Sequence, residues 1–251
     1  MMRAVQVGIY GLGRFGVFWA AQLARHFTVY AYSRRLHRPP VGVRMVSERH
    51  VLRCPVVILC VAISALEEVV DRIAPHLGPH TLVMDTCSIK GFAARVMERR
   101  LQPPVQILAT HPMFGPDSAR HGIAGQPMIL CPVRISGALL REWQTRFAAI
   151  GLRVVMMTAE QHDREAAFTQ GITHYLGRVL AEMGLGESTI STVGYRKLRE
   201  IMEQTCNDSL QLFLDLQRFN PFTAEMRERL EHALSTVRAQ LDTSPNHRST
   251  R

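Results

Sequence analysis

The chain has 251 residues, 47% of them hydrophobic and 20% charged, a composition that excludes an intrinsically disordered protein and fits one or two folded domains. The formal net charge is +9, but the arginines are scattered and not gathered with aromatic residues, so nucleic-acid binding is not expected. The sequence has no apolar run long enough to span a membrane, no secretory leader pattern, and five cysteines without CxxC spacing, so we expect a cytoplasmic protein with reduced thiols.

Residues 1–158 alternate short β-rich runs with helical patterns. This alternation is typical of a Rossmann-type α/β domain with a doubly wound, mostly parallel sheet. The expected strands are Val5–Tyr10, Thr28–Ser33, Val56–Ala62, Thr81–Asp85, Val105–Thr110, Met128–Pro132 and Arg153–Met157. The expected helices between them are Phe15–His26, Ala65–His76, Gly91–Arg100 and Gly137–Ile150.

From Ala159 onward the pattern is helical, and it predicts a smaller, all-helical C-terminal domain over residues 159–241 for substrate binding and dimerisation. Its expected helices are Ala159–Met183, Gly194–Asn220 and Phe222–Leu241, followed by a mobile tail over 242–251. A helical domain this small, with long apolar faces, is expected to complete its core against a second copy. We therefore predict a homodimer.

A glycine-rich turn follows the first expected strand and opens the first expected helix. It reads Gly11-Leu12-Gly13-Arg14-Phe15-Gly16. Such glycines allow a tight turn and let backbone N–H groups approach a pyrophosphate at a helix N-terminus. The strand–turn–helix context favours dinucleotide binding over a glycine-rich turn without a ligand.

The end of the second expected strand indicates which dinucleotide is bound. An NAD enzyme usually has Asp or Glu there for the ribose 2′-hydroxyl, whereas this chain has Ser33, Arg34 and Arg35. A hydroxyl and two guanidinium groups suit a 2′-phosphate, so we expect NADP. The alternative is that both arginines are solvated surface charges. Ser64, beyond the third expected strand, is a further cofactor-binding candidate.

Two polar segments follow strand ends, where doubly wound folds place their sites: Asp85–Lys90 and Thr110–Ser118. His111 starts a proline-braced turn in the second segment, and a neutral histidine is a suitable general base for an alcohol hydroxyl near pH 7. By itself, His111 is equally compatible with a structural role.

A third polar segment lies in the first helix of the C-terminal domain. Gln170, Thr173, His174 and Arg178 recur at about one helical turn, which predicts either the wall of a cleft or a solvated helix face. The neighbouring pair His162-Asp163 lacks a second ligand cluster, so no metal site is predicted.

These segments together resemble the prephenate/arogenate dehydrogenase family. The resemblance runs from Gly8 to about Asn220 and rests on GLGRFG, DTCSIK, THPMFGPDS and TQGITHYLGRVL. The later segment STISTVGYRKLREIMEQTCNDSLQLF is similar to the plant and cyanobacterial arogenate-type branch. The resemblance implies hydride transfer from ring C4 to the cofactor with loss of the ring carboxylate as CO₂, in tyrosine biosynthesis.

The resemblance also implies roles for single residues. His111 matches the catalytic histidine at the C4 hydroxyl, and Ser88 matches a serine that contacts that hydroxyl and the nicotinamide region. Gln170 and His174 match substrate-binding residues. An arginine of some family members grips the substrate carboxylate. The candidates for it here, between which the sequence does not decide, are Arg178, Arg196 and Arg199.

Asp208 bears on the choice of substrate. An acidic residue at this place goes with the arogenate-type branch, and an unpaired carboxylate there would attract the arogenate ammonium group. Its alternatives are a helix cap or a surface charge. Three other functions stay open: prephenate oxidation, oxidation of the 4-amino analogue of prephenate, and non-catalytic NADP sensing. A β-hydroxyacid dehydrogenase is disfavoured because the chain lacks a lysine between Lys90 and Lys197.

Overall fold

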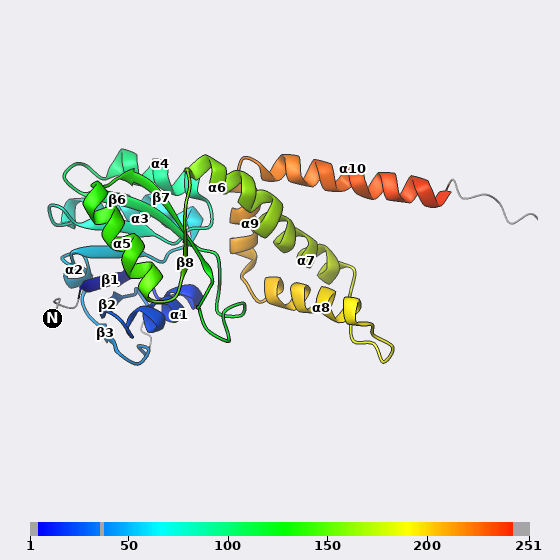
Figure 1. The fold of residues 1–251 in the computed structure, drawn as a ribbon, viewed down its shortest axis with the longest axis horizontal. Helices are drawn as coiled ribbons and strands as arrows, with labels where there is room; N and C mark the ends of the chain where they lie inside the picture. Colours follow the sequence, from blue (N-terminus) through cyan, green and yellow to red (C-terminus); the bar gives the residue numbers. More distant parts are fainter. Residues whose placement is uncertain (1–4, 36–37, 243–251) are drawn as a thin grey trace, which may run out of the picture.

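A single sheet of eight strands organises the N-terminal part of the molecule (Figure 1). The computed structural model describes residues 5–35 and 38–242. The strand order is β3-β2-β1-β4-β5-β6-β7-β8, and every neighbouring pair is parallel except β6 and β7. The strands are β1 (Gln6–Tyr10), β2 (Thr28–Tyr32), β3 (Val43–Met45), β4 (Val56–Leu59), β5 (Leu82–Asp85), β6 (Gln106–Pro112), β7 (Pro127–Arg134) and β8 (Arg153–Met156).

Helices cover both faces of this sheet. They are α1 (Arg14–Leu23), α2 (Glu48–Val51), α3 (Leu66–Ile73), α4 (Lys90–Arg100) and α5 (Gly137–Ala149). Side chains of α1 and α5 share one core with one face of the strands, and those of α2, α3 and α4 share a second core with the other face. In strand β4, alternate side chains point to opposite faces of the sheet, so Val56 and Ile58 join the first core whereas Val57 and Leu59 join the second. Both of its faces are buried, as a central parallel strand requires.

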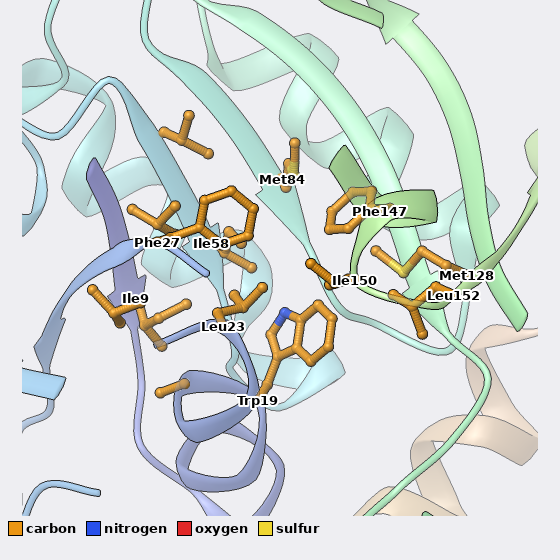
Figure 2. Close-up of a cluster of buried hydrophobic side chains, with 14 of the residues drawn as sticks. Ile9, Trp19, Leu23, Phe27, Ile58, Met84, Met128, Phe147, Ile150 and Leu152 are labelled. Carbon is orange, nitrogen blue, oxygen red and sulfur yellow. The ribbon is translucent and has the colours of Figure 1, made fainter. Parts of the chain in front are cut away.

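The first core is built around aromatic rings from helices far apart in the sequence. Figure 2 shows Trp19 of α1 and Phe147 of α5 over the strands, and their ring centroids are 6.4 Å apart. Phe114, after β6, meets Trp19 edge-on at 5.8 Å. Each such buried large side chain contributes roughly 1.5–3 kcal/mol. This packing holds the start of α1, and with it the glycine-rich turn, against the segment that follows β6.

The C-terminal part is helical, and its elements lie beside the sheet (Figure 1). They are α6 (Ala159–Ala166), a π-helical turn (Ala167–Gly171), α7 (Ile172–Glu182), α8 (Val193–Cys206), α9 (Leu210–Phe219) and α10 (Thr223–Asp242). The expected fold class, a Rossmann-type sheet followed by a smaller helical part, is thereby confirmed. Among the described helices, none is both long and apolar enough to cross a membrane.

The structure differs from the expected elements in several places. Strand β3 and helix α2 were not predicted, and the strand expected over Val56–Ala62 ends at Leu59. The helix expected over Gly194–Asn220 is two helices, because Ser209 caps the N-terminus of α9 by accepting from the Leu212 N–H. Asp242, expected in the tail, ends α10, and 243–251 lie outside the described residues.

Candidate active site

A cavity of about 770 Å³ lies between the strand ends and the helical part. Four loops and two helical segments line it. They are the glycine-rich turn, the segments after β4, β5 and β6, the residues Thr169–His174, and the segment that joins α8 to α9. A second cavity of about 820 Å³ shares Gly13, Arg14 and Cys60–Ala62 with the first and extends past the end of β2. The two cavities therefore meet at the glycine-rich turn.

The glycine-rich turn is shaped by close backbone contacts. Gly11 has φ 103°, a conformation that favours glycine, and its N–H donates to the Tyr32 carbonyl at 2.9 Å. A Cβ on Gly11 would lie 2.4 Å from the Cys60 oxygen, and one on Gly16 would lie 2.2 Å from the Gly11 oxygen. At Gly13 no atom lies within 4 Å of such a Cβ. The turn is thus packed against the sheet at two glycines and open at the third, as a bound pyrophosphate requires.

The second cavity carries the expected arginines. Ser33, Arg34 and Arg35 line it together with the turn residues Gly11, Leu12, Gly13 and Arg14. Phe15 and Gly16 line the first cavity instead. Arg72 of α3 also lines the second cavity, donates to the Tyr10 hydroxyl and lies 3.6 Å from Glu48. Burial raises the pKa of Tyr10 to about 12, so this hydroxyl stays neutral.

Ser64 has a different environment from the expected one. Its N–H and hydroxyl both donate to Oδ2 of Asp215 on α9, at 3.1 and 3.0 Å, and it is not among the residues that line either cavity. It therefore joins the segment after β4 to the helical part.

His111 and Ser88 line the first cavity from neighbouring strand ends. His111 is 3% exposed near the end of β6, and Ser88 is 8% exposed after β5. Burial is the largest cause that lowers the pKa of His111 well below its ordinary value, and the neighbouring His162 and Lys90 lower it further. His111 is therefore neutral at neutral pH and can accept a proton from a group in the cavity.

A buried ion pair supports this strand end. Lys90 and Asp85 are both fully buried and paired, and Lys90 Nζ also donates to the Thr110 carbonyl at 2.6 Å. The Thr110 N–H donates to Asp85 at 3.1 Å. Thr110 precedes His111 directly, so β5 and the start of α4 jointly fix the backbone that carries the histidine.

His162 and Asp163 of α6 lie behind His111. Nδ1 of His111 is 2.9 Å from Nε2 of His162, and Nδ1 of His162 is 2.9 Å from Oδ1 of Asp163. From the sequence, His162 and Asp163 were candidates only for a metal site, and no functional role was predicted for them. The signal in the sequence was the set of small apolar residues one helical turn from the pair, Ala159, Ala166 and Ala167, which indicates that this helix face is buried.

The helical wall carries Gln170 and His174. Oε1 of Gln170 and Nδ1 of His174 are buried without a hydrogen-bond partner in the described chain, and both residues line the first cavity with Thr173. Burial lowers the pKa of His174. Unpartnered polar atoms in a cavity wall are available to a ligand.

None of the arginines expected to grip a carboxylate lines this cavity. Arg178 donates to the backbone oxygen of Asp208 at 2.7 Å and lies over the Phe213 ring. Arg196 donates to the Ser191 oxygen, and Arg199 pairs with Glu203. Gln170, Thr173 and His174 line the cavity, whereas Arg178 supports the joint between α8 and α9, so its role as a substrate-binding residue stays a prediction.

Arg14 joins two carboxylates at the mouth of the cavity. It contacts Asp117 at 2.5 Å and Asp208 at 2.7 Å, and the guanidinium holds the pKa of Asp117 below its ordinary value. Asp208 does line the cavity, but the expectation of an unpaired carboxylate is wrong. In the part of the chain that the structure describes, Arg14 is the one arginine that lines this cavity. The same part contains no cluster of three or more His, Cys, Asp or Glu residues suited to a metal ion.

A comparison with known proteins identifies the family. Arogenate dehydrogenase 2, chloroplastic, of Arabidopsis thaliana is 35% identical over 251 residues, which cover 95% of this chain and 70% of that protein. The chain belongs to the prephenate/arogenate dehydrogenase family. Arogenate dehydrogenase 1, chloroplastic, of the same plant is 34% identical over 250 residues, 94% of this chain but 39% of that longer protein.

Two family models agree with this membership, and a solved structure shows the same fold. The model "Prephenate dehydrogenase, nucleotide-binding domain" matches residues 40–156, and "TYRAAT1-like, C-terminal domain" matches 179–251. The fold is that of the A. aeolicus prephenate dehydrogenase in complex with hydroxyphenyl propionate and NAD+, at a TM-score of 0.74 and 16% identity, over 96% of this chain and 91% of that one. As a member of the prephenate/arogenate dehydrogenase family, the chain is a dehydrogenase that binds a nicotinamide cofactor and a small-molecule substrate.

Proposed function

We propose that the protein is an NADP-dependent arogenate dehydrogenase of tyrosine biosynthesis, with prephenate as the alternative substrate. The observation that carries the proposal is the position of His111. This buried, neutral base lines the cavity that the glycine-rich turn closes on one side and Gln170 and His174 close on the other. A substrate hydroxyl in the cavity would have the base and the cofactor site beside it.

The cavity residues suit the chemistry of such a ring substrate. The nicotinamide, when bound, accepts the hydride from ring C4. His111 accepts the C4 hydroxyl proton as the carbonyl character develops, and Ser88 donates to the same oxygen. The bonding electrons of the departing CO₂ complete the aromatic ring, so the oxygen regains its proton from His111 and no proton is lost overall. The protein therefore needs only to align C4 of the substrate with the nicotinamide and to provide one group that accepts a proton and returns it.

Arogenate is favoured over prephenate by the charge at the mouth of the cavity. Asp117 and Asp208 share the single positive charge of Arg14, so this cluster keeps one net negative charge. Arogenate has an ammonium group where prephenate has a keto oxygen, and a negative cluster attracts only the former. The plant relatives named arogenate dehydrogenases agree with this choice.

NADP is favoured over NAD by Ser33, Arg34 and Arg35, which line the second cavity without a carboxylate among them. Two guanidinium groups can bind the oxygens of a 2′-phosphate. We expect kcat/KM for NADP to exceed that for NAD, and Arg34→Ala with Arg35→Ala to lower it about tenfold or more with NADP. Kinetics with both cofactors check this; a wild-type preference for NAD would contradict it.

The experiment for the proposed activity is direct. Purified protein is mixed with NADP and either arogenate or prephenate, and the absorbance of the reduced cofactor is followed. Reduction with arogenate at the higher efficiency supports the proposal, and higher efficiency with prephenate supports the alternative. If neither substrate reduces NADP or NAD, the proposed activity is replaced by one of two alternatives, a non-catalytic NADP sensor or a dehydrogenase that oxidises the 4-amino analogue of prephenate. A cytoplasmic location stays a prediction, since the two plant relatives are named chloroplastic.

A further inference from the structure

Nδ1 of His111 begins a buried chain of three polar groups. Nδ1 of His111 is 2.9 Å from Nε2 of His162, whose Nδ1 is 2.9 Å from Oδ1 of Asp163. His162 and Asp163 are each 2% exposed, and neither lines a cavity described above. The contact joins the sheet, through β6, to the first helix of the helical part.

Asp163 is fixed as the anionic end of this chain. Its two carboxylate oxygens accept from the backbone N–H of Lys90 at 2.7 Å and of Gly91 at 2.8 Å, at the N-terminus of α4. The residue before α4, Ile89, provides no side-chain cap, so Asp163 takes that place from another element. A helix N-terminus and two N–H donors stabilise the charged carboxylate.

The protons along the chain follow from this carboxylate. Because Asp163 only accepts, Nδ1 of His162 carries a proton and donates to it. With His162 in its neutral form, Nε2 of His162 is the acceptor and Nδ1 of His111 is the donor. This leaves Nε2 of His111, a residue that lines the cavity, without a proton. Only this tautomer of His111 can accept a proton from a substrate hydroxyl.

We propose that His162 and Asp163 are positioning residues that hold His111 in its proton-accepting tautomer and relay part of the positive charge that it gains toward the Asp163 carboxylate. The inference rests on the proposed function. When Nε2 of His111 takes the hydroxyl proton, its Nδ1–H is shared with His162, and the Nδ1–H of His162 with Asp163. All protons move back when the product oxygen regains its own, so the step needs no further reactant.

The opposite arrangement is a protonated His162 that donates to both Asp163 and Nδ1 of His111. His111 would then carry its proton on Nε2 and could not act as a base. Other charged or titratable groups around the pair are Lys90 and Arg95 on α4, Asp85 on β5 and Cys131 on β7. The thiol is neutral because burial raises its pKa to about 12. The Lys90 ammonium, which is paired with Asp85, lowers the pKa of His111.

Kinetics of two variants test the relay. His162→Phe keeps a ring without an acceptor, and we expect kcat to fall about 10²-fold while KM for both substrates changes by less than about twofold. His162→Gln can accept from His111 and donate to Asp163 but cannot carry charge, so it should recover part of the loss. His76→Phe, at an exposed histidine, is the matched control and should retain wild-type kcat. A kcat of His162→Phe within about twofold of wild type would overturn the proposal.

The pH profile separates the relay from a purely structural role. The acid limb of kcat/KM reports protonation of His111. A neutral acceptor stabilises the imidazolium of His111, so removing it in His162→Phe should move the limb to lower pH. An unmoved limb would indicate a structural role, and a limb at higher pH would indicate a protonated His162. Either result overturns the proposal.

A measurement without substrate keeps the inference separate from the proposed activity. The ¹⁵N shifts of labelled histidines, assigned with a His111→Asn variant, report which ring nitrogen of His111 carries the proton. We expect protonated Nδ1 in the wild type. Protonated Nε2 overturns the proposal, whether or not the enzyme turns over. Absence of turnover with protonated Nδ1 would instead refute the proposed substrate and leave the tautomer assignment standing.

Discussion

Asp208 is the residue at which substrate choice is best tested. Its carboxylate lines the cavity and shares Arg14 with Asp117. Asp208→Asn removes the net negative charge of this cluster, and we expect the ratio of kcat/KM for arogenate to that for prephenate to fall about tenfold. The ratio is measured with both substrates at saturating NADP.

Asp117→Asn is the matched control, because it removes the same charge from the same guanidinium while leaving Asp208 in place. A smaller change of the ratio in Asp117→Asn identifies a direct role for Asp208. If Asp208→Asn leaves the ratio at its wild-type value, the cluster does not select the substrate, and the charge argument fails.

Single residues were predictable from the sequence where a motif and a strand end coincide. His111, Ser88 and the glycine-rich turn were expected to lie together, and His111, Ser88 and the turn residues 13–16 line one cavity. Contacts between distant segments were not predictable, since Arg14 and Asp208 are 194 residues apart and Lys90 and Asp163 are 73 apart. The pairing of Asp208, the use of Arg178 as a brace and the position of His162 behind His111 all depend on such contacts.

At the scale of elements, the glycine-rich turn makes a prediction that separates folding from cofactor binding. A Cβ on Gly16 would lie 2.2 Å from a backbone oxygen, whereas one on Gly13 meets nothing within 4 Å. Gly16→Ala should therefore lower both the melting temperature and NADP affinity. Gly13→Ala should keep the melting temperature and raise the Kd for NADP about tenfold, because its methyl group takes the space of the pyrophosphate.

Thermal unfolding and NADP titration by fluorescence measure the two effects. Equal losses of stability in both variants would show that the turn is packed differently, and unchanged NADP affinity in Gly13→Ala would place the pyrophosphate elsewhere.

The helices α7 and α8 are held together at a second close approach. A Cβ on Gly177 would lie 1.9 Å from the Thr205 hydroxyl and 3.0 Å from its Cβ. Gly177→Ala should force the helices apart and cost about 1–3 kcal/mol of unfolding free energy. In the control Gly194→Ala the nearest atom is 3.9 Å away, so a neutral or slightly stabilising effect is expected. Denaturant unfolding measures both, and equal costs would contradict the steric explanation.

Most elements could be predicted because their apolar periodicity is strong. The exceptions are short or interrupted. Strand β3 has three residues and α2 has four, too few to show a period. The π-helical turn Ala167–Gly171 does not interrupt the helical pattern of the sequence. The break before Ser209 does not interrupt it either, because the new helix begins at a capping serine and no proline or glycine marks the break.

At the scale of the whole molecule, the site depends on contacts between the sheet and the helical part. Ser64 bonds Asp215, Arg14 pairs with Asp208, and Lys90 and Gly91 donate to Asp163. Each contact joins a residue that lies shortly after a strand, either in the following segment or in the first turn of the next helix, to the C-terminal part. These polar contacts therefore fix the two walls of the cavity relative to each other. Because the same groups also hold catalytic or cofactor-binding segments, a change in the orientation of the two parts would change the geometry of the site.

Helix α10 makes the prediction that concerns assembly. It projects from the body of the molecule (Figure 1), and only Thr223 and Met226 at its start are buried. Residues 231–242 are all exposed, including Leu234, Val237 and Leu241 on one helical face. A helical stretch of this length is only marginally stable without tertiary packing, and an apolar face on it is suited to a partner. We therefore expect a homodimer that buries this face.

Leu234→Arg with Leu241→Arg should give a monomer, because two charges would be buried unpaired at the interface. The matched control is Ser235→Arg with Asp242→Arg, which has the same spacing on a neighbouring face and should stay dimeric. Light scattering at working concentration gives the mass of each variant and of the wild type. A wild-type mass equal to one chain would contradict dimerisation. A dimer that survives only the leucine substitutions would instead assign the interface to the neighbouring face.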